Sequence, residues 1–138
     1  MILERVRIIL EESCLIDPYK PLLLGVSGGP DSLFMLDAFH KLGYQLVIAH
    51  FDHGLRPSSA AEQEKIRTVA ARYQYPFLAG REDIRTYARR NRQSIEEAAR
   101  NLRYRFLFSQ AESARCQAVA VGHNANDQVE TVLMHFLR

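Results

Sequence analysis

Short apolar runs alternate with longer segments of mixed character along this chain. Four apolar runs, at residues 22–26, 46–50, 77–79 and 118–121, have the length and the flanking turn residues of buried β-strands. Between them, apolar residues recur three and four positions apart, which is the spacing of amphipathic helices. The pattern therefore predicts strands and helices in alternation.

Start and stop signals give the predicted helices their ends. Residues 30–41 begin with a proline in the first turn and are followed by Gly43, as is common at the two ends of a helix. Ser59 with Glu62, and Ser94 with Glu97, have the spacing of a capping box. The helices that they open are expected to bury two apolar stripes: Ile66, Val69, Ala70, Tyr73 and Ile95, Ala98, Leu102, Phe106.

Three other segments complete this prediction. An amphipathic helix that packs on the domain is expected at the N-terminus, where Ile2, Leu3, Val6, Ile9 and Leu10 recur at helical spacing. Residues 126–137 are predicted to form a last helix. The segment RTYARRNR, residues 85–92, gathers four arginines without an acid, and we expect it to be irregular or weakly helical. A solvated surface and a contact with a polyanion both remain open for it.

Strands and helices in this order predict an α/β fold. Right-handed crossovers would build an open, doubly wound parallel sheet of Rossmann-like type, with helices on both faces. No repeat or interdomain linker interrupts residues 1–138, so we expect one domain. Ligands of such sheets bind beyond the carboxyl ends of the strands, near the point where the strand order reverses.

Composition narrows the class of protein. The sequence is 47% hydrophobic and 25% charged, which is ordinary for a globular domain, and no apolar run approaches the ~20 residues that cross a bilayer. Glu4, Arg5 and Arg7 interrupt the apolar N-terminus, unlike a secretory signal. Cys14 and Cys116 lie far apart, which argues against a disulfide framework or a zinc site. We expect a cytoplasmic protein that does not contact a membrane.

The turn SGGPDS, residues 27–32, carries the strongest chemical signal. It joins the end of the first strand to a helix N-terminus, where backbone N–H groups attract anions. Gly28 and Gly29 let the backbone approach a phosphate, and Ser27 and Ser32 offer hydroxyl donors. The turn matches neither GxGxxG nor GxxxxGK(S/T), the two commonest phosphate loops.

Asp31 is unexpected in a turn that binds phosphate. A carboxylate would repel the phosphates unless a divalent cation lay between them, so we predict that Asp31 binds Mg²⁺. The alternative is that Asp31 only stabilises the helix N-terminus.

Four stretches of the sequence resemble one known family. SGGPDS resembles the SGGxDS signature of the PP-loop, or N-type, ATP pyrophosphatases. Three more stretches are similar to the tRNA(Ile)-lysidine synthetases within that superfamily: AHFDHGLRPSS (49–59), SIEEAARNLRYRFL (94–107) and GHNANDQVETVLMHFLR (122–138). Because the four matches come in the same order and span nearly the whole chain, it is identified as a member of this family.

The resemblance implies a reaction and its substrates. ATP and Mg²⁺ would be the cofactors, and tRNA(Ile) with a CAU anticodon and L-lysine would be the substrates. The loop, which includes Pro30, would hold the pyrophosphate of ATP while the α-phosphate is attacked. C2 of the wobble cytidine would be adenylated, and lysine would then displace AMP to give lysidine.

Candidate site residues follow the second strand. It runs into HFDHGLRP, where a backbone edge would hold adenine. His50, Asp52, His53 and Arg56 are expected around the mouth of the loop, although histidines at such positions can also be structural.

The long helix carries two candidate arginines. Arg100 and Arg103 are about one turn apart on one flank, and Glu96 lies a turn before Arg100. An exposed Glu–Arg pair is one interpretation. The resemblance favours a catalytic one, in which Arg103, rather than Arg100, stabilises the charge that develops at the α-phosphate.

The last motif follows the fourth strand, at the same sheet edge as the glycine turn. Asp127 is expected to complete the Mg²⁺ or substrate site opposite Asp31, with His123 and Glu130 lining it. The family usually has two adjacent acids here, whereas this chain has Asn126, which can coordinate through its carbonyl but brings no charge.

The chain stops at Arg138, whereas the family continues, so we expect an N-terminal fragment that keeps the nucleotide half-site. An open sheet edge would permit a homodimer. Two other functions remain open. One is a related tRNA thiolase or amidating synthetase, against which the lack of a cysteine pair counts. The other is a noncatalytic ATP-binding module.

Overall fold

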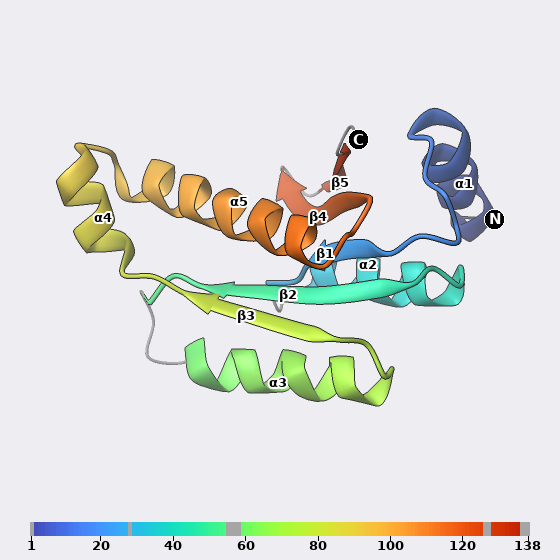
Figure 1. Ribbon diagram of the computed structural model, residues 1–138, viewed down its shortest axis with the longest axis horizontal. Coiled ribbons are helices and arrows are strands. Elements are labelled where there is room, and N and C mark those ends of the chain that lie inside the picture. The colour runs from blue at the N-terminus through green and yellow to red at the C-terminus, as the bar shows by residue number, and fades with distance from the viewer. Residues whose placement is uncertain (1, 28, 55–58, 126–127, 136–138) are drawn as a thin grey trace.

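The computed structural model describes residues 2–27, 29–54, 59–125 and 128–135 (Figure 1). Within these residues, one sheet has the strand order β3-β2-β1-β4-β5. The strands are β1 (Leu22–Gly25), β2 (Leu46–Asp52), β3 (Phe77–Arg81), β4 (Ala118–Ala125) and β5 (Gln128–His135). The first four are parallel to one another, and β5 is antiparallel to β4. The predicted α/β fold with a doubly wound parallel sheet is confirmed.

Helices precede the sheet and connect its parallel strands. They are α1 (Ile2–Ile8), the π-helical turn η1 (Ile9–Ser13), α2 (Pro30–Lys41), α3 (Ser59–Arg72), α4 (Ile84–Asn91) and α5 (Ile95–Ser113). Among the described residues, none of these helices combines the length and the apolar character that crossing a bilayer requires.

Alternate residues of β1 enter two different cores, because successive side chains of a strand point to opposite faces. Leu22 and Leu24 pack in a core that includes Phe39 of α2 and Ile66 of α3. Leu23 packs on the other face with residues of α5. Helices α2 and α3 therefore cover one face of the sheet and α5 covers the other, and Figure 1 shows α3 and α5 on opposite sides.

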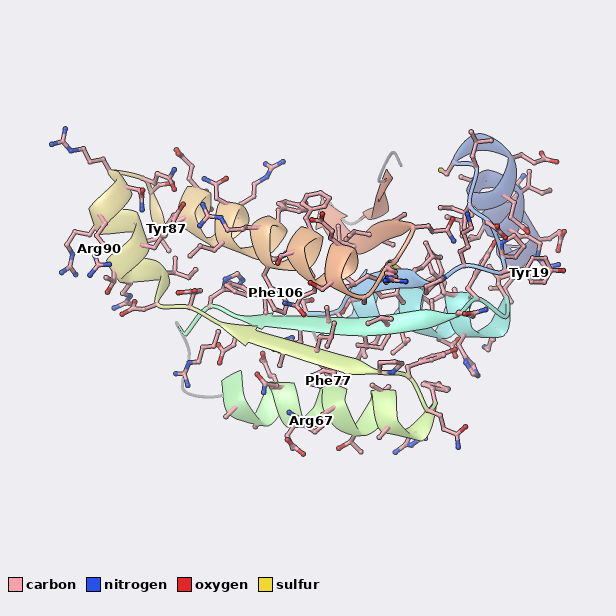
Figure 2. All side chains as sticks on the ribbon, viewed as in Figure 1. Tyr19, Arg67, Phe77, Tyr87, Arg90 and Phe106 are labelled. Atoms are coloured by element: carbon pink, nitrogen blue, oxygen red, sulfur yellow. The ribbon has the colours of Figure 1, made fainter. Side chains whose placement is uncertain are left out.

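Two glycines let α5 lie close to the sheet. A Cβ atom at Gly80 of β3 would stand 2.4 Å from the nearest ring atom of Phe106, which Figure 2 shows between α5 and the strands. A Cβ atom at Gly25 of β1 would stand 2.8 Å from Val121 and 3.0 Å from Leu107. Real Cβ atoms do not approach so closely, so glycine at these positions is required by packing.

Most predicted element starts agree with the structure. Strand β2 begins at the predicted residue and runs two residues further than expected, and α2 has the predicted bounds. Ser94 caps α5, since its Oγ accepts a hydrogen bond from the Glu97 N–H at 3.1 Å. The buried stripe of α5 includes Ala98 and Leu102, but Ile95 is 42% exposed, so its predicted burial is wrong.

The segment predicted as irregular or weakly helical contains a regular helix, α4. Asp83 caps it, because its Oδ1 accepts a hydrogen bond from the Thr86 N–H at 3.2 Å. Ile84 and Ala88 are buried against Ala98 and Leu102 of α5. One cap and two buried residues, four positions apart, are enough to make this arginine-rich segment an amphipathic helix.

The predicted helix at residues 126–137 is wrong. In the described part of this segment, Gln128–His135 form β5, which pairs with β4 from Ala118↔His135 to Ala125↔Gln128. An eight-residue stretch of this kind fits a strand as well as a helix, and its Val129, Thr131 and Val132 are β-branched. Pairing satisfies the edge of β4, whose N–H and C=O groups would otherwise lie open.

Candidate functional site

The strand order reverses at β1. Strand β2 lies on one side of β1 and β4 on the other, and the connecting helices change faces accordingly. The segment that follows β1 therefore leaves the carboxyl edge of the sheet at the topological switch point and enters the N-terminus of α2. This is where open α/β sheets bind their ligands.

The loop after β1 is held by its own serines. Ser32 Oγ accepts a hydrogen bond from the Ser27 N–H at 3.2 Å and donates one to the Gly29 carbonyl at 3.0 Å. The Gly29 N–H lies 3.4 Å from Ser27 Oγ. Ser32 is buried and Ser27 is exposed. Ser32 thus shapes the loop from beneath, while the Ser27 hydroxyl is accessible from outside.

Gly29 has no reason within the described protein to be a glycine. Its φ of −73° and ψ of 163° suit any residue. A Cβ atom there would meet only Ser27 Oγ, at 3.6 Å, among the described atoms. The space where this Cβ would stand opens beside the first turn of α2, whose N–H groups and dipole favour an anion. The loop therefore fits a phosphate that approaches the backbone closely.

His50 ties the loop to the neighbouring strand. It is buried in β2, and its Nδ1 lies 2.8 Å from the carbonyl oxygen of Val26, the residue that follows β1. Since a carbonyl only accepts, Nδ1 must carry the proton and donate it. The Val26 N–H in turn donates to the Ala49 carbonyl at 2.8 Å. The hydrogen bond of His50 is thus with the backbone at the start of the loop, and its predicted part in the nucleotide site stays a prediction.

Asp52 organises the turn after β2. It is 6% exposed, and its Oδ1 accepts a hydrogen bond from the Gly54 N–H at 2.8 Å. Its Oδ2 lies 3.7 Å from Arg81 Nε at the end of β3. The backbone at Gly54 has a φ of +70°, a conformation that glycine adopts without a steric cost.

Of the two residues near the turn after β2, His53 was a candidate from the sequence and Arg81 was not. Arg81 was missed, because its approach to Asp52 depends on β2 and β3 ending side by side, beyond the predicted strands 46–50 and 77–79. His53 was a candidate, and its ring packs edge-on against Phe51 with centroids 5.2 Å apart.

Arg103 and Arg100 lie in the part of α5 that is nearer the same edge of the sheet. Leu107 of α5 packs over Gly25, the last residue of β1. Arg103 and Arg100 precede Leu107 by about one and two turns on the same helix stripe, so they lie about 6 and 10 Å further along the axis. The N-terminal end of α5 is the end beyond the strand tips (Figure 1).

Both arginines make a cation–π contact with the same aromatic ring. The guanidinium carbon of Arg103 lies 5.5 Å, and that of Arg100 5.8 Å, from the centroid of the Tyr104 ring. Arg103 is half-buried and Arg100 is exposed. Among the described residues neither has an ion pair, so the predicted alternative of a Glu96 pair is not present in this conformation.

Several candidates cannot be placed. Gly28, Arg56, Asn126 and Asp127 lie outside the described residues, as do the side chains of Pro30, Asp31, His123 and Glu130. No cluster of three or more metal-ligating side chains occurs within the described part of the chain. The magnesium pair Asp31 and Asp127 remains a prediction.

A glycine turn at a switch point, entering a helix N-terminus, defines a nucleotide- or phosphate-binding α/β domain. The comparison with known families makes the class specific: the PP-loop domain matches residues 4–138. The chain belongs to the PP-loop family.

Relatives with curated names are similar over nearly the whole chain. The tRNA(Ile)-lysidine synthase of Thermus thermophilus is 39% identical over 88% of this chain and 24% of its own length. Those of Dehalococcoides mccartyi and Geobacter sulfurreducens are 38% and 34% identical over 100% and 99% of this chain, and each is covered over 30% of its own length. The chain thus spans less than a third of these relatives.

Solved structures share the fold. The U34-tRNA thiolase NcsA from Methanococcus maripaludis superposes with a TM-score of 0.73 at 17% identity, over 91% of this chain and 45% of that one. An NH3-dependent NAD synthetase from Campylobacter jejuni superposes with a TM-score of 0.67 at 14% identity, over 86% of this chain and 53% of that one. At these identities the likeness concerns the fold alone.

Proposed function

We propose that this chain is the nucleotide-binding part of an ATP-dependent ligase that forms lysidine in tRNA(Ile). The enzyme adenylates C2 of the wobble cytidine in the CAU anticodon, releases pyrophosphate, and lets L-lysine displace AMP. The observation that carries this proposal is the 34–39% identity to tRNA(Ile)-lysidine synthases over nearly the whole chain.

The geometry of the loop supports the ATP half of the reaction. Its backbone, with Gly29 open to the outside and Ser27 exposed, binds the pyrophosphate of ATP. His50 holds the loop at its β1 end through the Val26 carbonyl. Asp31 and Asp127 would hold Mg²⁺, which would supply positive charge to neutralise the phosphates. Arg103, beyond the tip of β1, stabilises the charge that develops at the α-phosphate.

The cysteines favour this function over a thiolase of the same family. The sequence contains two, Cys14 and Cys116. Cys14 packs against the core that includes α2, and Cys116 lies in the core beneath α5, so the sheet separates them. Burial also raises the pKa of the Cys116 thiol to about 11, which leaves little thiolate for sulfur chemistry at neutral pH.

A lysine-incorporation assay tests the proposal. The whole gene product is incubated with ATP, Mg²⁺, radiolabelled L-lysine and tRNA(Ile) transcripts whose wobble base is either cytidine or uridine. We expect ATP-dependent incorporation into the cytidine transcript alone. Incorporation of sulfur in place of lysine would support a thiolase, and ATP binding without any transfer would support a noncatalytic module.

A further inference from the structure

Helix α4 exposes an unusually dense set of positive charges. It is anchored on one side by Ile84 and Ala88, which are 0% and 4% exposed. The remaining positions and the C-cap carry the exposed residues Arg85, Arg89, Arg90 and Arg92, which we call the α4 basic face. Arg85 and Arg89 are one turn apart and therefore share one side of the helix.

No ion pair neutralises the α4 basic face within the described part of the chain. Among the described residues, none of its guanidinium groups has a carboxylate within ion-pair distance, although Glu82, Asp83, Glu96 and Glu97 lie on the flanking segments. Both carboxylate oxygens of Asp83 accept hydrogen bonds from Thr86. One comes from the Thr86 N–H at 3.2 Å and the other from the Thr86 hydroxyl at 2.8 Å. These hydrogen bonds, with a smaller contribution from the positive charge of Arg89, lower the pKa of Asp83, so it stays charged as the cap of α4.

Stabilisation of the helix dipole does not account for four arginines. Cations in the last turn of a helix contribute to stability, but the effect falls off within that turn. Arg89 and Arg90 lie in the last turn, whereas Arg85 is in the first turn, where a positive charge opposes the dipole. Arg90 projects from α4 away from the rest of the molecule (Figure 2).

The fold places the α4 basic face at the same edge of the sheet as the candidate site. Helix α4 follows β3 beyond the carboxyl edge of the sheet, the edge from which the loop after β1 also emerges (Figure 1). Tyr87 of α4 fixes α4 to α5, because its hydroxyl accepts a hydrogen bond from Arg105 at 3.2 Å and its ring lies 5.6 Å from the Arg105 guanidinium carbon. The arginines are thus carried by a helix with a defined position.

We propose that the α4 basic face binds the phosphodiester backbone of the RNA substrate, outside the site where the chemistry occurs. The inference rests on the proposed function, which supplies an RNA as the polyanion. Arginines on a fixed helix match a row of phosphates, since each guanidinium can donate two hydrogen bonds to one phosphate. Backbone contacts position a nucleic acid without reading its sequence.

Matched charge removal tests this surface in the whole gene product. The test variant is Arg85→Gln with Arg89→Gln on α4. The control is Lys65→Gln with Arg72→Gln, which removes two exposed charges from α3 on the opposite face of the sheet. Binding of a tRNA(Ile) transcript and of an unrelated RNA of equal length is measured by fluorescence anisotropy between 50 and 300 mM salt, and thermal unfolding verifies that each variant is folded.

The α4 variant should bind both RNAs more weakly, with the slope of log affinity against log salt reduced by about 1.4, the value for two lost phosphate contacts in a single strand. The control should keep the wild-type slope. In the lysine assay, the α4 variant should raise KM for tRNA and retain kcat at saturating tRNA. Affinity for ATP should be unchanged in both variants.

Two results would overturn the inference. One is an α4 variant that binds RNA with the wild-type affinity and salt slope. The other is a loss of binding to phosphatidylserine vesicles, rather than to RNA, which would assign the surface to a membrane. A wild-type protein that binds RNA through α4 but incorporates no lysine would leave the inference standing and reject the proposed function.

Discussion

Gly29 and Gly80 illustrate how the same residue serves two purposes in one domain. Gly80 is buried under Phe106, and a Cβ atom has no room there. Gly29 lies at the mouth of the loop, where a Cβ atom would fit among the described residues. The sequence marks Gly29 as part of a candidate phosphate turn, but it gives no sign that Gly80, within β3, is required by packing. The structure separates a glycine that packing requires from one that a ligand would require.

Replacement of Gly80 is expected to lower stability through overpacking. Gly80→Ala should reduce the free energy of unfolding by about 1–3 kcal/mol, because the Phe106 ring must move. Guanidinium denaturation measures this loss. In a Phe106→Leu background the same substitution should cost less, and equal losses in the two backgrounds would contradict the contact.

Gly29→Ala should leave stability nearly unchanged and weaken ATP binding.

The hydrogen bond of His50 supports the loop from the next strand. His50→Leu should reduce the free energy of unfolding by about 1–3 kcal/mol, since the Val26 carbonyl loses its partner in a buried position. His50→Asn keeps a donor at a similar place and should retain more of the stability. Denaturation and ATP titration of both variants make the comparison. Identical behaviour of the two variants would show that the bond contributes nothing.

Arg103 is expected to act mainly in the transition state of adenylation. In the whole enzyme, Arg103→Ala should lower kcat for adenylate formation roughly 10²- to 10³-fold, with little change in ATP affinity. Arg103→Lys should rescue poorly, because an ammonium lacks the planar fork. Single-turnover adenylation at saturating tRNA measures the rate. A wild-type rate would remove Arg103 from the catalytic residues, and a salt-dependent rise in KM for tRNA would make it an RNA contact.

At the level of elements, the contribution of the α5 N-cap to the free energy of unfolding can be measured directly. Ser94→Ala should reduce the free energy of unfolding by about 1 kcal/mol, because the Glu97 N–H loses its acceptor at 3.1 Å. Ser94→Asp should preserve the cap and serve as the matched control. Denaturant unfolding of the two variants gives the difference, and an unaltered midpoint in Ser94→Ala would mean that water replaces the hydroxyl.

The elements that could be predicted from sequence carry redundant local signals. For α2, a proline at the start, a regular apolar stripe and Gly43 with a φ of +85° all agree. The predicted helix at 126–137 failed because the decisive interaction is pairing with β4, which is not local. The helicity of α4 was underestimated, since its stability comes from Ile84 and Ala88 packing on α5 and not from its arginines.

In the candidate site, too, some residues could be assigned from the sequence and others could not. The candidate phosphate loop could be located from sequence because its residues are contiguous, from Ser27 to Ser32, whereas its binding of phosphate stays a prediction. The partnership of Asp52 with Arg81 was not predictable, because it depends on β2 and β3 ending side by side. The role of Ser32 within the loop could not be predicted either, since the sequence shows a hydroxyl donor but not that the Gly29 carbonyl accepts from it.

At the scale of the whole molecule, Cys116 reports on global unfolding. Burial raises the pKa of its thiol from 9.0 to about 11, so between these pH values the unfolded chain releases a proton that the folded chain retains. The corresponding stability is fully present below pH 9 and is lost as the pH rises towards 11. In a Cys14→Ser protein, an aromatic disulfide reagent at pH 8 should label Cys116 only at denaturant concentrations that unfold the domain. Rapid labelling without denaturant would contradict this.

The central place of β1 in the sheet also sets an order of assembly. Leu22 of β1 can pair with Leu46 of β2 soon after both are synthesised, but its other neighbour, Ala118 of β4, follows much later in the sequence. Closing such a long loop is entropically slow, so contacts of this kind form late. During translation, the edge of β1 that will pair with β4 therefore stays unpaired while α2, α3, α4 and α5 are synthesised. A nascent chain of this design has a period of vulnerability to misassociation that ends only when its fourth strand leaves the ribosome.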